Sequence, residues 1–272
     1  MASNDIITPQ KRRVLTRLKS SKKLWRAVEM LPASSRFFCI FRTMKTIIIT
    51  GANGNLGAVT VKKFLEHNYR VIAVARSGSE LGFAKDNKNF ELHQLDLTDE
   101  NASLLFIKEA ISLYGNIEGA LFLAGGFAMG NMENSTGDAL KKMLALNFET
   151  AYHLSRILFD HMLQNGYGRL VFIGAKAVSE PEYAKNSVAY TLSKSLLFSL
   201  ANILNSAAKG KNVTASVVAP STIDTLPNRE SMPNADWSKW AKPEQIADVL
   251  EFICSDKGLS LREPVYKVYN DA

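Results

Sequence analysis

A glycine-rich turn between an apolar run and a helical pattern constrains the fold of this chain more than any other feature. Residues 45–50, KTIIIT, are apolar and β-branched, as in a strand buried on both faces of a sheet. The next segment, TGANGNLG (50–57), carries glycines three residues apart, and a helical pattern runs from Leu56 to about Asn68. Such glycines allow a tight turn and bring backbone N–H groups close to a pyrophosphate at a helix N-terminus. An ordinary glycine-rich turn is the alternative reading.

Strand-like and helix-like segments alternate along the rest of the chain. Strands are expected at 45–50, 70–75, 90–97, 119–125, 168–174 and 213–220, with an edge strand at 264–270 and long helices at 134–164 and 187–209. This alternation predicts an α/β fold, a doubly wound (Rossmann) parallel sheet in a single domain at residues 44–272. The proline-containing stretch 221–243 follows a strand's carboxyl end and is expected to form a lid.

The net charge of +7 comes from the first 43 residues. They hold ten of the 33 Lys and Arg and two of the 26 Asp and Glu, so the remaining chain holds 23 bases and 24 acids. The body is therefore nearly neutral, and we expect no nucleic-acid partner. The basic extension 1–43 is an organelle-targeting segment, a disordered tail, or sequence upstream of a natural start at Met44.

Cysteine and histidine usage indicates no metal site. Cys39 and Cys254 form neither a zinc spacing nor a disulfide framework, and the four histidines show no ligand pattern. No apolar run reaches membrane-spanning length. We therefore expect a cytoplasmic protein without membrane contact that acts on a small molecule, with organelle targeting by residues 1–43 as the alternative.

The motif YTLSK places Tyr190 four residues before Lys194, so the two side chains share one face of the expected helix. A nearby ammonium would lower the pKa of the phenol and allow it to move protons at neutral pH. Coincidental spacing on a solvated helix is the alternative.

The end of the second expected strand indicates the cofactor. An acid there would accept a hydrogen bond from the adenosine ribose, whereas an arginine would bind a 2′-phosphate. Here Ala75 holds the acid position and Arg76 and Ser77 follow, which favours NADP(H), with NAD(H) as the alternative. Asp96 is placed to hydrogen-bond the adenine amino group, and Leu97 to pack on the ring.

Three motifs in order, TGANGNLG, LAGG (123–126) and YTLSK, resemble the short-chain dehydrogenase/reductase family over about residues 44–272. The resemblance implies that Tyr190 donates a proton and that Lys194 binds the nicotinamide ribose and tunes the tyrosine. It implies that Asn147 in LALNFET holds a water relay behind the lysine. The cofactor-binding residues would be Thr50, Gly51, Asn53, Gly54, Asn55, Leu56, Gly57, Arg76, Asp96, Leu97, Ala124, Gly125, Gly126, Lys194, Pro220, Thr222 and Ile223.

Further segments resemble the quinoid dihydropteridine reductase branch of that family, namely AGGFAMGN (124–131), IGAKAV (173–178) and PSTIDTLPNRESMPNADWSKW (220–240). The wider family carries a substrate-binding serine where this chain has Gly174, Ala175 and Ala177, and the pteridine branch also lacks it. Ala75 and Arg76 depart from the branch, which has an aspartate there. The substrate residues implied are Phe127, Gly174, Ala175, Lys176 and Tyr190.

Together these features predict an NADP(H)-dependent reductase that transfers hydride to an electrophilic C=N or C=O centre, with a quinonoid dihydropterin as the candidate substrate. Two alternatives stay open: a reductase of ordinary ketones or 3-oxoacyl groups, and a non-catalytic NADP-binding sensor or scaffold. The apolar stripes of the helices at 134–164 and 187–209 lead us to expect a homodimer or homotetramer, as the resemblance implies.

Overall fold

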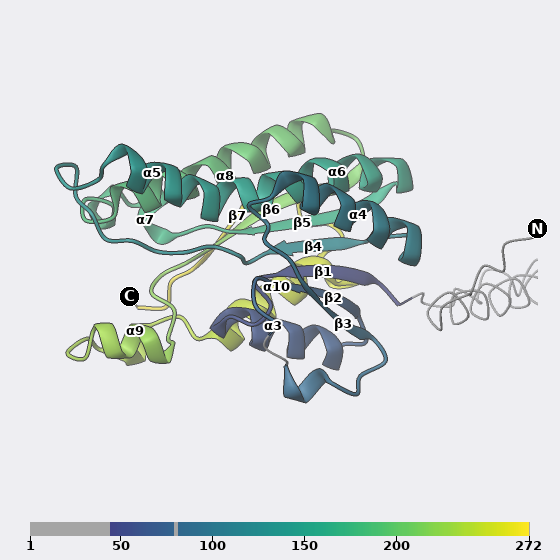
Figure 1. Ribbon diagram of the computed structural model, residues 1–272, viewed down its shortest axis with the longest axis horizontal. Helices are drawn as coiled ribbons and strands as arrows, with labels where there is room; N and C mark the ends of the chain where they lie inside the picture. The colour runs from purple at the N-terminus through teal and green to yellow at the C-terminus, as the bar shows by residue number, and fades with distance from the viewer. Residues whose placement is uncertain (1–43, 79–80, 272) are drawn as a thin grey trace, which may run out of the picture. The chain divides into compact units, whose positions relative to one another are not determined.

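The computed structural model describes residues 44–78 and 81–271, and Lys45–Ala272 form one compact unit (Figure 1). The basic extension at 1–43, with its targeting alternatives, lies outside the described residues. In the described part of the chain, no helix is both long enough and apolar enough to cross a membrane.

Among the described residues, seven parallel strands form one sheet in the order β3-β2-β1-β4-β5-β6-β7. The chain starts in the middle of the sheet, runs to one edge and returns to build the other half, which confirms the predicted doubly wound fold. The strands are β1 Thr46–Thr50, β2 Arg70–Ala75, β3 Phe90–Gln94, β4 Gly119–Phe122, β5 Tyr167–Ile173, β6 Asn212–Pro220 and β7 Val265–Val268.

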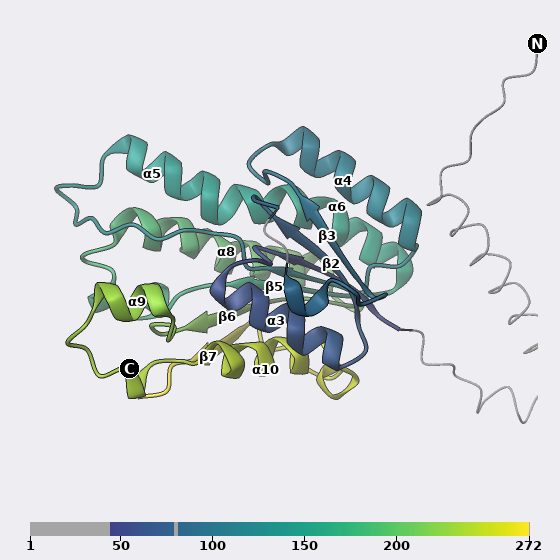
Figure 2. The same ribbon diagram turned by 60° about the horizontal axis from the view of Figure 1, so that its bottom comes forward.

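Helices cover both faces of the sheet (Figures 1 and 2). Successive side chains of a strand point to opposite faces, so Ile48 packs into one apolar cluster while Ile47 and Ile49 pack into the other. The first cluster lies under α4 Glu100–Tyr114, α6 Thr150–Asn165 and α8 Val188–Ala207. The second lies under α3 Asn55–Glu66 and α10 Pro243–Cys254. Burial on both faces is why the central strands are continuously apolar.

The helical region expected at 134–164 contains a π-helical turn. Helix α5 (Gly137–Leu144) passes through η2 (Ala145–Glu149) into α6. A π turn adds one residue to a helical turn and changes the direction of the side chains there. Here Asn147 is buried with 1% exposure.

The stretch 221–243, expected to form a lid, contains α9 (Leu226–Ser231) and η4 (Trp237–Lys239). Strands β3 and β4 end at Gln94 and Phe122, earlier than the expected ends at 97 and 125. The remaining short elements are η1 Gly82–Ala84, α7 Lys176–Ser179, η3 Pro181–Tyr183 and η5 Asp256–Gly258.

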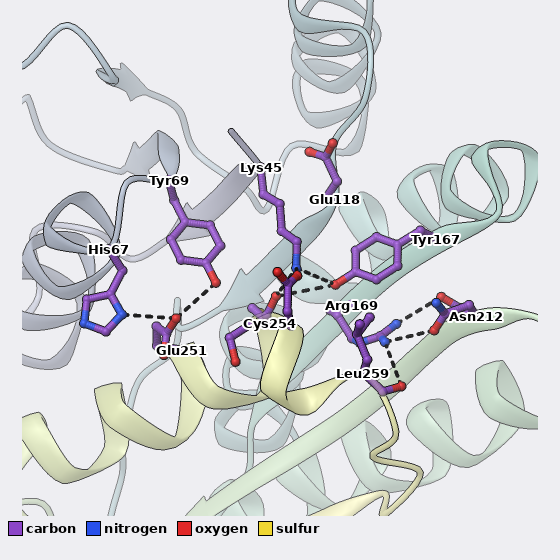
Figure 3. A network of polar contacts seen from close by, with 12 residues as sticks. Lys45, His67, Tyr69, Glu118, Tyr167, Arg169, Asn212, Glu251, Cys254 and Leu259 are labelled. Carbon is purple, nitrogen blue, oxygen red and sulfur yellow. Dashed lines mark hydrogen bonds and ion pairs between the residues drawn. The ribbon is translucent and has the colours of Figure 1, made fainter. Parts of the chain in front are cut away.

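A polar network holds the amino edge of the sheet together (Figure 3). Lys45 Nζ donates to the Tyr167 hydroxyl at 3.1 Å and to the Cys254 carbonyl at 2.9 Å, which joins the start of β1 to β5 and α10. Buried Arg169 donates to the carbonyl of Asn212 at 3.0 Å and to its side-chain oxygen at 2.9 Å. These contacts join elements at the amino ends of the strands, whereas the predicted site residues lie at the carboxyl ends.

Candidate active site

The glycine turn has the conformation that its sequence requires. Gly51 has a φ of +63°, in the left-handed region, and a Cβ there would lie 2.8 Å from the Ala124 nitrogen. A Cβ on Gly57 would overlap the Gly51 carbonyl oxygen. Helix α3 begins at Asn55, after Gly54 as N-cap, with no acidic residue in its first turn. The first N–H groups of a helix, here those of Asn55 and Leu56, have no partner within the helix. Together with the positive end of the helix dipole, they make this turn suitable for binding phosphate.

Thr50 connects the glycine turn to the loop after β4. Its buried hydroxyl oxygen accepts hydrogen bonds from the backbone nitrogens of Leu123 at 3.0 Å and Ala124 at 3.1 Å. The predicted site segments 50–57 and 124–126 are therefore neighbours at the carboxyl edge of the sheet.

Asn53 connects the glycine turn to the end of β2. Its side-chain nitrogen donates to the Ser77 carbonyl at 3.2 Å and to the Ser77 hydroxyl at 2.9 Å. The exposed Arg76 stands next to that anchored serine. The Arg76 guanidinium therefore lies at the end of β2, where the sequence analysis predicts the 2′-phosphate of the ribose.

Asp96 and Leu97 differ in how well they suit the predicted adenine contacts. Asp96 accepts hydrogen bonds from the backbone nitrogen of Thr98 at 3.0 Å and from its hydroxyl at 2.8 Å, and these bonds lower the pKa of the carboxyl. The carboxyl stays exposed. The Leu97 side chain is 6% exposed and belongs to the hydrophobic core, so little of it remains for contact with a ring.

Tyr190 and Lys194 lie together on α8. The Lys194 Nζ atom is 6.0 Å from the centroid of the Tyr190 ring, and it donates to the Ile173 carbonyl at 2.8 Å. Burial lowers the pKa of Lys194 to about 8 and raises the pKa of Tyr190 to about 12. The sequence-based expectation that Lys194 lowers the pKa of Tyr190 is therefore not met in this structure, because desolvation dominates for both groups.

Asn147 reaches the same place from the π turn. Its Oδ1 accepts from the Gly126 nitrogen at 2.9 Å, and its Nδ2 donates to the Ser193 hydroxyl at 3.1 Å. A Cβ on Gly125 would lie 2.5 Å from Asn147 Oδ1 and 3.4 Å from Lys194 Nζ. The Asn147 amide and the Lys194 amine thus both lie next to the backbone of Gly125 and Gly126 in the loop after β4.

Phe127 covers one side of the tyrosine. The two rings meet edge to face, and Phe127 itself is 61% exposed. Its loop is held to the start of α8 by hydrogen bonds from the Gly130 nitrogen to Asn186 O (2.8 Å) and from the Val188 nitrogen to Gly130 O (2.9 Å). An aromatic face is therefore open beside the phenol.

The segment after β5 has no room for the serine of the wider family at its first position. A Cβ on Gly174 would lie 2.6 Å from Val217 Cγ1 and 2.7 Å from Phe198 Cε2. Ala175 is buried. The Lys176 amine stands 3.4 Å from a Glu180 oxygen and 4.0 Å from the centroid of the Tyr183 ring, so it contacts its own loop and helix.

The predicted lid is joined to the sheet at a narrow base. It follows β6 at Pro220, and Thr222 and Ile223 pair with Ala241 through the bond from Ala241 N to Thr222 O at 3.0 Å. Beyond that base, Arg229 makes a two-pronged ion pair with Asp224 and lies 4.8 Å from the centroid of the Trp237 ring. The segment is therefore folded on itself.

Ser193 was missed by the sequence analysis, although it lies inside the YTLSK motif. The signal that could have identified it is its position, because Ser193 is a polar residue within the buried stripe of α8. That stripe includes Ala189, Leu197, Leu200, Ala201 and Leu204. Within the described residues, no group of three or more His, Cys, Asp or Glu side chains could hold a metal ion.

Comparison with known proteins gives a family and a fold. The family model of short chain dehydrogenases matches residues 45–236. The 3-oxoacyl-[acyl-carrier-protein] reductase FabG of Buchnera aphidicola is 23% identical over 233 residues, which cover 78% of this chain and 91% of that protein.

Two solved structures share the fold. A putative NAD(P)-dependent gluconate 5-dehydrogenase from Beutenbergia cavernae, with bound NADP, has a TM-score of 0.76 at 22% identity and covers 83% of this chain and 95% of its own. A 4-hydroxyisoleucine dehydrogenase complexed with NADH has a TM-score of 0.74 at 22% identity, and covers 83% of this chain and 97% of its own.

Proposed function

We propose that this chain, which belongs to the short-chain dehydrogenase family, is an NADP(H)-dependent reductase of an electrophilic C=N or C=O centre. One observation carries the proposal. Tyr190 and Lys194 lie together on α8, beside the Gly125 loop and at the sheet edge where the glycine turn opens α3. A bound nicotinamide dinucleotide would supply the hydride, and the chain's own residues would hold the reactants and deliver the proton.

Tyr190 is the group that would deliver the proton. With a pKa of about 12, its hydroxyl is protonated at neutral pH and can act as an acid toward the reduced centre. Donation leaves a phenolate, which the nearby Lys194 ammonium would stabilise. Because the pKa of Lys194 is about 8, that positive charge is present at neutral pH and declines above pH 8.

The residues at the glycine turn fit a dinucleotide. The backbone N–H groups at the start of α3 and the side-chain-free cradle of Gly51 and Gly57 would receive the pyrophosphate. Arg76, next to the serine that Asn53 anchors, would pair with a ribose 2′-phosphate. This supports NADP(H) over NAD(H).

We propose a quinonoid dihydropterin as the substrate. The exposed Phe127 face offers a stacking surface for a flat bicyclic ring beside Tyr190. Gly174, Ala175 and Ala177 provide no serine hydroxyl, a donor that an ordinary carbonyl needs as it becomes an oxyanion. A quinonoid ring regains conjugation on reduction and needs less of that help.

A reductase of ketones or 3-oxoacyl groups is the second candidate, which the similarity to a 3-oxoacyl reductase supports. A panel of quinonoid dihydropterin, 3-oxoacyl thioesters and simple ketones, followed by NADPH oxidation, separates the two. Tyr190→Phe should abolish turnover of the true substrate and leave NADPH binding intact; unchanged turnover would refute the proposed acid. NADPH binding without turnover of any substrate would instead indicate the sensor or scaffold alternative.

We further propose that the protein is at least a homodimer through α8. Leu192, Leu196 and Ile203 are 50%, 37% and 65% exposed on that helix. Multi-angle light scattering on the wild type and on Ile203→Glu would test this, since a monomeric wild type contradicts it. We also propose a cytoplasmic location, a domain boundary at residue 44 and a lid at 221–243. The N-terminal residue of the mature protein would test the boundary.

A further inference from the structure

Ser193 lies directly before the proposed lysine in sequence and is fully buried. Its hydroxyl donates to the Tyr190 carbonyl at 2.7 Å, three residues earlier on α8. The same oxygen accepts from Asn147 Nδ2 at 3.1 Å, across from a different helix. A serine that only satisfied its own helix would need the first of these bonds and not the second.

The direction of each hydrogen bond in this chain is determined by chemistry. The Gly126 N–H can only donate, so the Asn147 oxygen must face it and the Asn147 NH₂ must face Ser193. An NH₂ group is a donor, so the Ser193 oxygen must accept and its hydrogen must go to the Tyr190 carbonyl. The donors therefore all point one way, from the Gly126 N–H in the loop after β4, through Asn147 and Ser193, to the Tyr190 carbonyl.

The alternative orientation of the Asn147 amide is unfavourable. Rotation would turn its NH₂ toward the Gly126 N–H, so that two donors would face each other. The Lys194 amine, another donor, is also close, since a Cβ on Gly125 would lie 3.4 Å from its Nζ. The other acceptor for the Asn147 NH₂ group is the sulfur of Met143, 3.7 Å from Nδ2, and a thioether is a weak acceptor. Ser193 is thus the strong acceptor for the Asn147 NH₂ group in the orientation that the Gly126 N–H imposes.

We propose that Ser193 is a positioning residue: it fixes the amide of Asn147 and, through it, the backbone of Gly126, whose neighbour Gly125 lies close to the Lys194 amine. The inference rests on the proposed function for its kinetic consequence, and on the hydrogen-bond chain alone for its structural one. Ser195 provides a matched control, because its hydroxyl makes the same bond three residues back, to Leu192 O at 2.7 Å, on the exposed side of α8.

The structural test needs no cofactor. Amide hydrogen exchange of Gly126 is measured in the wild type, Ser193→Ala and Ser195→Ala. We expect exchange at Gly126 to rise about tenfold in Ser193→Ala and to stay unchanged in Ser195→Ala, because only the first variant leaves the buried amide of Asn147 without its oxygen partner. Equal exchange in all three proteins would overturn the proposal.

The kinetic test is a double-mutant cycle. Ser193→Ala should lower kcat about tenfold with less than about a threefold change in KM for NADPH, and should add little in an Asn147→Ala background. Ser193→Thr, which keeps the hydroxyl, should recover most of kcat. Full additivity with Asn147→Ala would overturn the positioning role. A wild type that neither binds nor oxidises NADPH would refute the proposed function, whereas the exchange result at Gly126 would stand separately.

Discussion

The ring of Phe127 meets the ring of Tyr190 edge to face, with 4.9 Å between centroids and 73° between planes. Phe127 comes from the loop after β4, and Tyr190 from the first turn of α8. Nothing in the spacing of 63 positions suggests this contact. It forms because parallel strands end at a common edge, where Gly130 also pairs with the start of α8.

This contact predicts that Phe127 is a determinant of substrate binding. Phe127→Ala should raise KM for a flat aromatic substrate up to about tenfold, because a stacking contact contributes about 0.5–1.5 kcal/mol. Phe127→Trp, which keeps a flat ring, should retain wild-type KM within about threefold. Steady-state kinetics with a pterin and with a small aliphatic ketone would test it. An equal loss for both substrates would argue that the ring only holds the loop.

The fold could be predicted from the sequence because the spacing of apolar residues matches the residues that the strands and helices bury. Continuous apolar runs gave the central strands, and the glycine turn marked the first strand-to-helix connection. The π turn at Ala145–Glu149 could not be foreseen, because the extra residue disturbs the helical period by only one position. That single insertion decides where Asn147 points.

The pKa values also lay beyond the sequence. The spacing of Tyr190 and Lys194 indicates a mutual electrostatic effect, but the extent of desolvation depends on the strands and helices packed around them. Burial proved the larger influence on both groups.

Lys194 should make the stability of the protein depend on pH. Its pKa is about 8 when folded, below the ordinary 10.5, so the unfolded chain binds more protons between these values and stability rises with pH there. From pH 7 to pH 9.5 this contributes about 2 kcal/mol. Other groups titrate in that range, so the quantity to measure is the difference between wild type and Lys194→Met in urea unfolding. No difference in pH dependence would mean that Lys194 keeps an ordinary pKa.

Arg76 should determine the choice of cofactor. Arg76→Asp should raise KM for NADPH about 10- to 100-fold, because a charge-assisted contact with the 2′-phosphate is replaced by repulsion. KM for NADH should change little or fall. Lys85→Asp serves as a control for a general change of surface charge. If the NADPH-to-NADH preference is the same before and after the substitution, Arg76 does not contact the phosphate.

Arg169 should stabilise the fold without affecting catalysis. It is 1% exposed, and its guanidinium donates to the carbonyls of Gly168, Asn212 and Leu259 at the amino edge of the sheet. Arg169→Met would remove these hydrogen bonds, although the Leu259 carbonyl would keep Arg262 as a donor at 2.9 Å, and should cost about 2–4 kcal/mol in unfolding free energy. Arg156→Met, which removes an exposed ion pair with Glu100, should cost at most about 1 kcal/mol. Urea unfolding of both variants at pH 7 would compare them, and similar values would contradict the assigned role.

Gly57 provides the sharpest test of the cofactor cradle. A methyl group there would overlap the Gly51 carbonyl oxygen and come within 2.9 Å of Ala52, so Gly57→Ala must displace the turn. The carbonyl and the N–H groups of the turn would lose their geometry, and affinity for NADPH should fall by at least about 100-fold. Gly54→Ala meets the same oxygen at 3.2 Å and should weaken binding less.

Gly82→Ala is the control for this series, because its added methyl would meet nothing within 4 Å. NADPH fluorescence titration gives the affinities, and circular dichroism shows whether each variant is folded. The expected order of affinity is wild type and Gly82→Ala, then Gly54→Ala, then Gly57→Ala. Because this order follows from the space around each Cβ, a folded Gly57→Ala protein with wild-type affinity would mean that the dinucleotide does not lie on this turn.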